Sequence, residues 1–455
     1  MSSPSLAAII LAAGKGTRMR SNLPKVLHPI AQRPMIGHVL TALEPLAPER
    51  IAVVVAPGME EVAAAVRPAT TAVQSEALGT AHAVLAARHA LAGFAGDVLV
   101  LYGDVPLVTT ATLEALVAER RRAPEAAVVV LGMRLAEPGA YGRLVAAPDG
   151  TLAKIVEAAD CTPAERAITL CNSGLMAADA RHLFALLEGI GRENAKGEYY
   201  LTDIVAAARR HDLLCRVLEA PAEELKGVNS RADLAEAEAA MQRRLRRAAM
   251  AAGVSLLAPE TVFFSADTRI GSDSTIGPFV VFGLGVTIGE GVQIPAFCHI
   301  AGATIGDRAI IGPFARLRPG AELAPEVHIG NFVEVKNARL ARGVKANHLA
   351  YLGDSTVGSN TNVGAGTITC NYDGIEKFRT EIGENVFIGT NSSLVAPVSI
   401  GAGAFIAAGS VITEDVPADA MAIGRGRQVV KPGGAALWRA RRGNAALAKE
   451  PRGKR

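Results

Sequence analysis

The chain has 455 residues, of which 50% are hydrophobic, 20% charged and 4% aromatic, and its formal net charge is +3. This length is more than one hydrophobic core usually serves, and the apolar fraction excludes an intrinsically disordered protein. The nearly balanced charge does not indicate a nucleic-acid-binding surface. Residues 439–455 are basic and are expected to form a solvated tail.

The first 230 residues alternate short β-branched runs with helical patterns. The runs AAIILAAG, RIAVVVA, DVLVLYGD and EAAVVVLG are separated by segments such as TAHAVLAARHAL. This alternation is typical of βαβ units and predicts a Rossmann-like α/β domain with a parallel sheet. Such sheets bind ligands beyond the carboxyl ends of their strands, so functional residues are expected just after these runs.

The segment LAAGKGTRM (11–19) follows the first predicted strand. Its glycines let backbone N–H groups approach an anion, and Arg18 and Lys25 supply positive charge. This combination suits a nucleoside triphosphate, although it is neither a Walker A nor a dinucleotide-binding pattern. The alternative is a glycine-rich turn that binds no ligand.

Two further segments fall at or near predicted strand ends. YGD (102–104) places Asp104 where a carboxylate can hold Mg²⁺ against phosphates, and a turn cap is its alternative role. QSEALGTAHA (74–83) offers Gln74 to a base edge, while Gly79 and Thr80 open a helix. Taken alone, this segment could equally be an exposed glutamine before an ordinary helix.

These segments, in order with YGR, IVE, NSG and GVN, resemble the sugar-1-phosphate nucleotidyltransferases, and in particular their uridylyl-transferring members. The resemblance implies in-line attack of a sugar phosphate on the α-phosphorus of UTP, helped by positioning and charge neutralisation instead of a covalent residue. It also implies that Asp104 and Asn229 ligate Mg²⁺ and that Arg18 and Lys25 serve catalysis. The other implied substrate-binding residues are Leu11, Ala12, Ala13, Gly14, Gln74, Gly79, Thr80, Tyr102 and Gly103, together with Gly142, Glu157 and Asn172 for the amino sugar.

After Asn229, the segment RADLAEAEAAMQRRLRRAAMAAG is rich in helix formers. Leu234, Met241 and Ala248 are seven residues apart, which places them on one face and predicts a linker helix over residues 231–252. The arginines of RRLRR could bind nucleic acid, but a solvated helix face is the favoured interpretation. The expected domains are therefore a nucleotidyltransferase domain (1–230), this helix, and a third domain with the tail (253–455).

From residue 269 onward, aliphatic residues recur every six positions. Neither an α-helix nor a simple strand has this period, whereas a triangular, left-handed parallel β-helix does, with the aliphatic side chains in its core. The predicted core positions are Ile270, Ile276, Phe282, Ile288, Ile294, Ile300, Ile305, Ile311, Leu317, Leu323, Ile329, Val335, Ile382, Ile388, Leu394, Ile400, Ile406 and Ile412.

The same period places residues 18 apart at equivalent positions on successive coils, about 4.8 Å from each other. Arg318 and Lys336 form one such pair. Stacked like charges are unfavourable unless an anion lies beside them, so the pair suggests a phosphate site, with two independent solvated charges as the alternative. Thr390 and Ala408 form a second pair, a column of small side chains that either accommodates a long thin ligand or only allows tight packing.

Two stretches interrupt the period, residues 340–352 and 369–381, and are predicted to be loops. They contain His348, Tyr351, Asn371 and Tyr372, which differ from the repeats around them. Such loops are candidate sites, and His348 is a candidate general base, although a lone histidine in a loop is often a bystander.

Five motifs extend the resemblance over nearly the whole chain: GPFARLRPG, GNFVEVKNARL, KANHLAYLGD, GAGTITCNYDG and IAAGSVI. Together with the N-terminal motifs they resemble a family of bifunctional uridylyltransferase/acetyltransferases that make UDP-N-acetylglucosamine, a cell-wall precursor. The resemblance implies acetylation of glucosamine 1-phosphate by acetyl-CoA, followed by uridylyl transfer from UTP with release of pyrophosphate. It further implies a homotrimer whose acetyltransfer sites are built between subunits.

By this resemblance His348 is the general base that takes a proton from the sugar amine as it attacks the thioester. The implied acetyltransferase ligands are Arg318, Lys336, Tyr351 and Asn362 for the sugar phosphate, Asn371 and Tyr372 for both substrates, and Ala365, Thr390, Ala408 and Arg425 for acetyl-CoA. Thr390 stands where serine is common in the family, and either Arg425 or Arg427 could contact the CoA phosphates.

Two other functions fit less well. A nucleotidyltransferase whose β-helix only oligomerises would not need NHLAYLGD or the stacked charges, and a zinc hydratase would need His299, His328 and His348, which lack a close-spaced pair. The five cysteines show no CxxC or metal spacing, and no basic segment precedes the apolar run 7–13. These features predict reduced thiols, no signal peptide, and a cytoplasmic enzyme without membrane or nucleic-acid partners.

Overall fold

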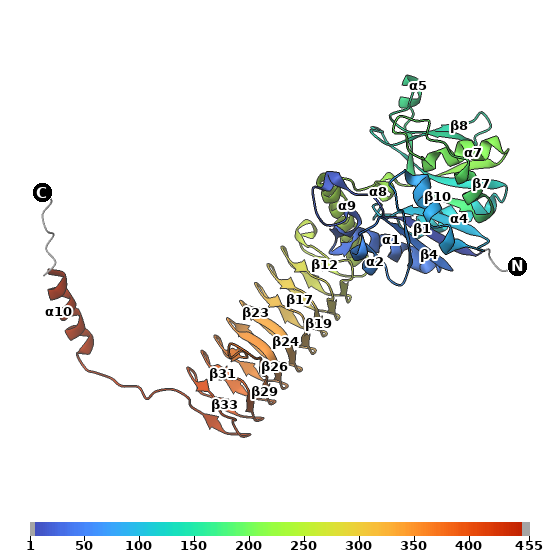
Figure 1. Ribbon diagram of the computed structural model, residues 1–455. Helices are drawn as coiled ribbons and strands as arrows, with labels where there is room; N and C mark the ends of the chain where they lie inside the picture. Colours follow the sequence, from blue (N-terminus) through green and yellow to red (C-terminus); the bar gives the residue numbers. More distant parts are fainter. Residues whose placement is uncertain (1–4, 448–455) are drawn as a thin grey trace, which may run out of the picture. The chain divides into compact units, whose positions relative to one another are not determined.

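The computed structural model describes residues 5–447. The chain divides into two compact units, Met1–Val286 and Thr287–Arg455 (Figure 1). The first predicted coils of the β-helix therefore belong to the N-terminal unit. Within residues 5–447, no helix combines the length and the apolar character that crossing a membrane demands.

The N-terminal unit is built on a nine-stranded sheet. Its strands are β1 Leu6–Leu11, β4 Arg50–Val55, β5 Thr70–Val73, β6 Asp97–Tyr102, β7 Ala126–Arg134, β8 Arg143–Ala146, β9 Leu152–Val156, β10 Leu170–Asp179 and β11 Leu214–Glu219, while β2 Pro29–Ile30 and β3 Arg33–Pro34 form a separate pair. The main path runs in the order β11-β7-β10-β6-β1-β4-β5.

Most pairings along the main path of the sheet are parallel, as predicted, and β10 is the exception. β1 pairs in parallel with β4 and β6, as the alternating pattern predicts. β10, however, runs antiparallel to both β6 and β7. Between β7 and β10 the chain forms the β8–β9 hairpin and one short helical turn instead of the long crossover helix that a parallel return requires.

Strand β1 shows why the sheet is buried on both faces. All six of its residues are apolar and buried; Ala7, Ile9 and Leu11 enter one hydrophobic core, while Ala8 and Ile10 enter the other. Because side chains alternate between the faces of a strand, two covered faces require a continuous apolar run. The helices of this part are α1 Met35–Leu43, α2 Glu60–Ala65, α3 Thr80–Ala86, α4 Thr110–Arg122, α5 Pro163–Arg166, α6 Ala180–Glu188, α7 Ile204–Arg210 and α8 Ala222–Leu225.

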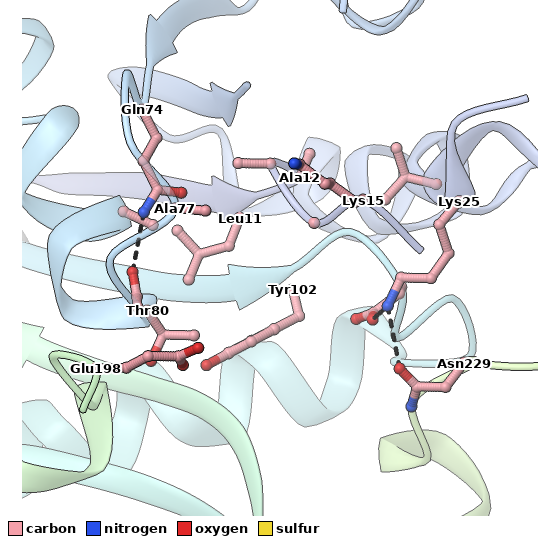
Figure 2. A pocket seen from close by; sticks show the side chains of 16 residues that line it. Leu11, Ala12, Lys15, Lys25, Gln74, Ala77, Thr80, Tyr102, Glu198 and Asn229 are labelled. Carbon is pink, nitrogen blue, oxygen red and sulfur yellow. Dashed lines mark hydrogen bonds and ion pairs between the residues drawn. The ribbon is translucent and has the colours of Figure 1, made fainter. Parts of the chain in front are cut away.

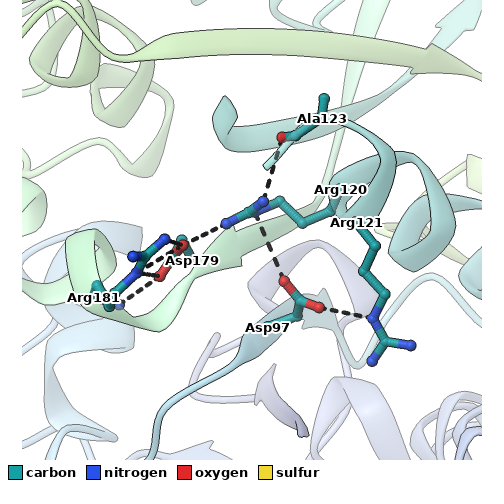
Figure 3. Close-up of polar contacts among 6 residues, drawn as sticks. All are labelled: Asp97, Arg120, Arg121, Ala123, Asp179 and Arg181. Carbon is teal, nitrogen blue, oxygen red and sulfur yellow. Dashed lines mark hydrogen bonds and ion pairs between the residues drawn. The ribbon is translucent and has the colours of Figure 1, made fainter. Parts of the chain in front are cut away.

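A buried ion cluster joins α4 to the sheet (Figure 3). Arg120 Nη2 lies 2.5 Å from Asp179 Oδ2, and its Nε lies 3.8 Å from Asp97 Oδ1. Arg121 Nε contacts the other oxygen of Asp97 at 2.9 Å, and Asp179 also caps α6 by accepting from the Arg181 N–H. Since every buried charge has an opposite partner, the cluster can link α4, β6 and β10 inside the core.

Helix α9, Arg231–Ala251, lies where the linker helix was predicted. Ser230 and Asp233 form a capping box at its start. Its buried residues Ala237, Ala240 and Met241 pack in a small core that includes residues of β2 and α1.

Two residues of α9 depart from the prediction. Ala248, expected on the buried face, is exposed, whereas Arg246, expected in solvent, is buried. Arg246 donates to the Val262 carbonyl and the Glu260 carboxylate, both at 2.9 Å. An α-helix drifts by about 20° per seven residues, so a strict seven-residue spacing leaves the buried face after two heptads.

The repeats form a parallel β-helix. In the N-terminal unit its strands are β12 Ser255–Leu256, β13 Arg269–Ile270, β14 Thr275–Ile276 and β15 Val281–Phe282. In the C-terminal unit they are β16 Thr287–Ile288, β17 Gln293–Ile294, β18 His299–Ile300, β19 Ala303–Ile305, β20 Ile310–Ile311, β21 Arg316–Leu317, β22 Ala321–Leu323, β23 His328–Asn331, β24 Glu334–Leu340, β25 Lys345–His348, β26 Tyr351–Val357, β27 Asn362–Val363, β28 Ile368–Cys370, β29 Thr380–Ile382, β30 Phe387–Ile388, β31 Ser393–Val395, β32 Val398–Ile400, β33 Phe405–Ile406, β34 Val411–Ile412 and β35 Met421–Ala422, followed by helix α10 Gly434–Leu447. All predicted core positions except Ile270 are buried.

Residues 340–352 do not form the predicted loop. They continue the coil through β24, β25 and β26, with Ala346 aligned to Ile329 and Leu352 to Val335. The six-residue period of aliphatic residues is not visible in this stretch for two reasons: the small Ala346 takes a core position, and these coils are one residue shorter than the regular coil. The second predicted loop is confirmed in part: β28 and β29 flank a turn in which Tyr372 forms a bridge with Lys377.

Candidate active sites

A cavity of about 370 Å³ lies at the carboxyl ends of β1 and β6 (Figure 2). Most of the predicted nucleotide-site residues line it, although they come from distant parts of the sequence. They are Leu11, Ala12, Ala13, Gly14, Lys25, Gln74, Gly79, Thr80, Tyr102, Asp104 and Asn229. The sheet thus brings together the three motifs that the sequence placed at strand ends.

The glycine loop packs closely on Lys25. Gly16 has φ +59°, and a Cβ there would lie 2.6 Å from Lys25 Cβ, so both the backbone conformation and the contact require glycine. The Lys25 ammonium bonds the Asp104 carboxylate and lies 3.1 Å from Asn229 Oδ1. Both Lys25 and Asp104 are more than four-fifths buried, so water screens their ion pair only weakly.

This ammonium identifies a point where two oxygen ligands converge. Asp104 and Asn229 both direct side-chain oxygen atoms at Lys25 Nζ. Figure 2 shows the contact between Lys25 and Asn229. A carboxylate and an amide oxygen are ligands that Mg²⁺ accepts, and this ion usually takes its remaining ligands from water and substrate phosphates. The donor set therefore fits Mg²⁺. Within residues 5–447, no cluster of three or more His, Cys, Asp or Glu side chains has a metal-binding arrangement.

The other end of the cavity is rigid. The buried Gln74 side chain donates to the Gly79 carbonyl at 3.0 Å and lies 3.2 Å from His82 Nδ1. Gly79 has φ +118°, and a Cβ there would lie 2.7 Å from the Tyr199 nitrogen. Thr80 Oγ1 accepts from the Leu201 N–H at 2.9 Å. The start of α3 is thereby held against residues 199–201, and only glycine fits at 79.

The three predicted amino-sugar residues do not line this cavity but lie beside it. The Asn172 N–H donates to the Gly142 carbonyl at 2.8 Å. Glu157 accepts from Thr202 Oγ1 at 3.2 Å, and burial raises the pKa of Glu157. Burial also raises the pKa of Tyr102, and the charges of Glu157 and Asp104 contribute, so both carboxylates lie near Tyr102.

Two predicted residues have other surroundings. Arg18 is exposed and does not line the cavity. The Gly103 N–H donates to the Leu11 carbonyl at 3.0 Å and so holds β6 to β1. Sequence reasoning missed Lys15, Ala77 and Glu198, which line the cavity, and Thr202 beside Glu157. Lys15 stood inside the glycine motif, whereas Glu198 and Thr202 lie in an irregular segment with no pattern to mark them.

In the β-helix, strand register places His348 on a column of residues. Asn331 pairs with His348, and Ala346 with Val363, which puts Ala365 at the level of His348. Val363 pairs with Ile388, and Ile388 with Ile406, so Ala365, Thr390 and Ala408 follow one another on successive coils. The predicted alignment of Thr390 with Ala408 is confirmed. Arg425 follows at the next coil, its Cδ 3.9 Å from where a Cβ on Gly409 would lie.

His348 is oriented by its neighbour in this column. Its Nδ1 lies 2.9 Å from Asn331 Oδ1. An amide oxygen only accepts, so Nδ1 carries the proton and Nε2 of the neutral ring is left as a proton acceptor. The sequence did not indicate Asn331, which stands in an ordinary repeat.

A cluster of cations lies on a neighbouring face. Leu317 pairs with Val335, which stacks Arg318 and Lys336 as predicted. Arg318 is neutralised by Glu334 at 2.8 Å, while Lys336 faces Lys377 from the loop after β28. Lys377 is the main cause of a lowered Lys336 pKa, with burial and Arg318 adding to it. Lys377 was missed, because its position depends on how the loop folds back.

The remaining predicted residues surround these cations. Tyr351 lies against Gly353, where a Cβ would be 2.5 Å from the Cζ atom of its ring, and Gly353 pairs with Lys336. Asn371 is buried and donates to Asp354. Tyr372 is exposed and donates to the Gly374 carbonyl at 2.6 Å, while Asn362 is half-buried on β27 beside β25.

Comparisons with known proteins match both halves of the chain. The family model of the MobA-like NTP transferase domain matches residues 8–169, and that of the bacterial transferase hexapeptide (six repeats) matches residues 267–302, 302–337 and 379–414. The bifunctional protein GlmU of Rhodospirillum rubrum is 61% identical over 434 residues, covering 95% of this chain and 97% of that protein. Those of Azorhizobium caulinodans (59%; 97% of this chain, 99% of that protein) and Paramagnetospirillum magneticum (54%; 97% and 98%) are similar over nearly their whole lengths.

Proposed function

The chain belongs to the family of the bifunctional protein GlmU, so it is a uridylyltransferase and an acetyltransferase in one polypeptide, and we propose which of its residues carry each reaction. The hexapeptide half acetylates glucosamine 1-phosphate from acetyl-CoA. The N-terminal half then joins the product to UMP from UTP, giving UDP-N-acetylglucosamine and pyrophosphate.

The uridylyl site is the cavity at the ends of β1 and β6. Gln74 and Gly79 are proposed to hold the uracil, because the Gln74 amide is fixed and buried there. Asn172 and Glu157, with Thr202, would bind the amino sugar beside Tyr102. Lys25 would move from Asp104 to the phosphates when UTP enters, since phosphate oxygens offer the ammonium more negative charge.

Asp104 and Asn229 are proposed to hold Mg²⁺, because their oxygen atoms already converge on one cation. When bound, this ion would neutralise the triphosphate and help expel pyrophosphate. Lys25 would then bind phosphate oxygens. Residues at the edge of the sheet would hold the sugar phosphate so that its attacking oxygen lies in line with the α-phosphorus of UTP. Arg18 keeps its proposed catalytic role only if the glycine loop moves, because it does not line the cavity.

The acetyltransferase site is proposed to use His348 as its general base. The observation that carries this assignment is the Asn331 contact, which leaves Nε2 free to take a proton from the sugar amine. As the amine attacks the thioester carbonyl and the C–N bond forms, Nε2 takes the amine proton; the C–S bond then breaks, and the leaving CoA thiolate takes this proton from His348. The column of Ala365, Thr390 and Ala408 leads from His348 toward Arg425 and offers a narrow track for pantetheine.

Arg318, Lys336 and Lys377 are proposed to bind the sugar phosphate. Lys336 and Lys377 face each other, an arrangement that a phosphate dianion would stabilise. Tyr351, Asn362, Asn371 and Tyr372 would contact the substrates around this anion. This use of the repeat argues against a β-helix that serves oligomerisation alone.

We also propose a homotrimer. Phe314, Phe332 and Leu349 form an exposed apolar column next to Asn331 and His348, and stacked rings at 5.2 Å link the two phenylalanines. Contiguous exposed apolar side chains are a common feature of subunit interfaces. A partner on this column would also border His348. The replacement Phe332→Asp should yield a monomer in sedimentation analysis, and a retained trimer would place the interface elsewhere.

A cytoplasmic location is proposed from thiol chemistry. All five cysteines are free, and four of them are buried. Buried cysteines without disulfides are usual in reducing compartments.

The decisive experiment is a paired assay on one preparation. Glucosamine 1-phosphate, acetyl-CoA and UTP are supplied together, and both the CoA thiol and pyrophosphate are followed. We expect both products, and Asp104→Asn should abolish pyrophosphate alone. His348→Ala should suppress CoA release and, with it, pyrophosphate release, and N-acetylglucosamine 1-phosphate supplied to this variant should restore pyrophosphate. If this addition restores no pyrophosphate, or if Asp104→Asn also abolishes CoA release, the two reactions do not use separate residues as proposed.

A further inference from the structure

Asp354, on β26, is a buried carboxylate that the proposed acetyl transfer does not use. Only 7% of its surface is exposed. Its Oδ1 accepts from Asn337 Nδ2 and its Oδ2 from Asn371 Nδ2. Burying a carboxylate costs free energy unless it is hydrogen-bonded and paired with a cation. A buried carboxylate beside the proposed acetyltransferase site therefore suggests a function.

The first consequence concerns the Asn371 amide. A carboxylate can only accept, so Asn371 must direct Nδ2 at Asp354 and turn Oδ1 the other way. Without this bond the amide could rotate, since its two ends differ little in size. Asp354 thus decides whether Asn371 offers an acceptor or a donor to its surroundings.

The second consequence concerns charge. Lys336 faces the cations Lys377 and Arg318, and Arg318 already has Glu334 as a partner. Asp354 follows Gly353, which pairs with Lys336 across the coils, and its carboxylate interacts with the charges of both Lys336 and Lys377. Burial opposes ionisation of Asp354, but the bonds from Asn337 and Asn371 and the two lysines outweigh it, so the pKa of Asp354 is lowered. The carboxylate is therefore charged at neutral pH, and its charge acts to raise the pKa of Lys336.

We propose that Asp354 is a positioning residue for acetyl transfer: it fixes the Asn371 amide with its oxygen toward the substrates and holds the Lys336–Lys377 pair ready for the sugar phosphate. This inference rests on the proposed acetyltransferase function. It assigns a role to a residue that touches neither substrate.

The test is Asp354→Asn in the full-length enzyme, with glucosamine 1-phosphate and acetyl-CoA as substrates. This variant keeps the shape but brings an NH₂ group against one of two donors. We expect kcat/KM to fall about 10- to 100-fold, the effect of losing a hydrogen bond to a charged group. KM for glucosamine 1-phosphate should rise and kcat should fall, while uridylyl transfer remains close to wild type.

The pH profile separates positioning from a merely structural role. Removing the Asp354 charge should lower the pKa of Lys336 further, so the alkaline limb of kcat/KM should move to lower pH in Asp354→Asn. Asn337→Ala is the matched control: it removes the other bond to Asp354 but leaves the charge, so the limb should stay in place. If the alkaline limb does not move in Asp354→Asn, or moves equally in Asn337→Ala, the Asp354 charge does not act on Lys336 as proposed.

Asn371→Ala provides a second test that does not depend on the folding of Asp354→Asn. It should lower kcat and leave the alkaline limb unchanged, and full activity in this variant would overturn the positioning of the amide. If the wild-type enzyme releases no CoA from these substrates, the proposed function fails. If the wild type is active and Asp354→Asn equals it, only the role of Asp354 fails.

Discussion

The position of Lys25 leads to a prediction about metal binding with an unexpected sign. Its ammonium bonds both Asp104 and Asn229, the two residues proposed to hold Mg²⁺. In the nucleotide-free enzyme, lysine and metal therefore compete for the same oxygen atoms. Replacing Lys25 with methionine keeps most of the side-chain volume and removes this competitor. We expect Lys25→Met to bind Mg²⁺ more tightly without nucleotide, and UTP more weakly.

The magnitude follows from the two bonds. Hydrogen bonds to charged groups contribute about 1.5–3 kcal/mol net, and 1.4 kcal/mol corresponds to a factor of ten in affinity. Lys25 and Asp104 are only 13% and 16% exposed, so little of the contribution is lost to solvent screening. In the unmodified enzyme, part of this free energy is recovered when Mg²⁺ displaces the ammonium and water solvates it. The dissociation constant for Mg²⁺ should therefore fall about tenfold in the variant.

Calorimetric titration of Mg²⁺ into nucleotide-free protein measures this effect directly. Lys15→Met is the control, because it removes a charge from the same cavity and leaves the Lys25 bonds intact. Any long-range effect of the lost charge on Mg²⁺ affinity appears in both variants. The effect of losing the contacts with Asp104 and Asn229 appears only in Lys25→Met. If Lys25→Met binds Mg²⁺ no better than Lys15→Met, lysine and metal do not share ligands and the proposed metal site is wrong.

Three further predictions concern the cavity, the base and the core. Gly79→Ala should raise KM for UTP at least tenfold in a pyrophosphate assay. The added Cβ would clash with the Tyr199 backbone, and residue 79 has a φ that favours glycine. An unchanged KM would show that the backbone can move to accommodate the Cβ. His348→Ala should slow CoA release about 10²- to 10⁴-fold, with a smaller loss in Asn331→Ala, and should leave pyrophosphate release intact when N-acetylglucosamine 1-phosphate is supplied; near-normal acetyl transfer would move the base elsewhere. Arg120→Met should lower the free energy of unfolding by about 3–5 kcal/mol in urea titrations, because two buried carboxylates lose a partner, whereas the exposed Arg181→Met should cost much less; equal losses would refute the role of burial.

The β-helix was predictable because its core demands one aliphatic residue at a fixed interval. Ile311, Leu317 and Ile329 are fully buried where the period placed them. The same rule failed at 340–352, where the small Ala346 occupies a core position in a shortened coil. Composition could not distinguish this coil from a loop, because the parallel backbone pairing that continues it leaves no mark on the sequence.

The nucleotide cavity was predictable only where its residues follow strands. Leu11 and Tyr102 end β1 and β6, so topology alone places them at one edge of the sheet. Glu198 and Thr202 belong to an irregular segment whose position depends on tertiary contacts, such as the Ala81 N–H donating to the Tyr199 carbonyl. No local pattern encodes such contacts, so these residues could be found only in the folded chain.

The acetyltransferase column shows how register can build a site without any local motif. His348, Ala365, Thr390 and Ala408 stand at unequal intervals in the sequence, yet strand pairing places them on successive coils. The extra residues between Val363 and Ile388 leave the coil in the turn that carries Lys377, so they do not disturb the column. That excursion also places Lys377 against Lys336. One insertion thus preserves the track proposed for acetyl-CoA and completes the cationic site proposed for the sugar phosphate, which explains why the irregular part of the repeat carries so much of the candidate site.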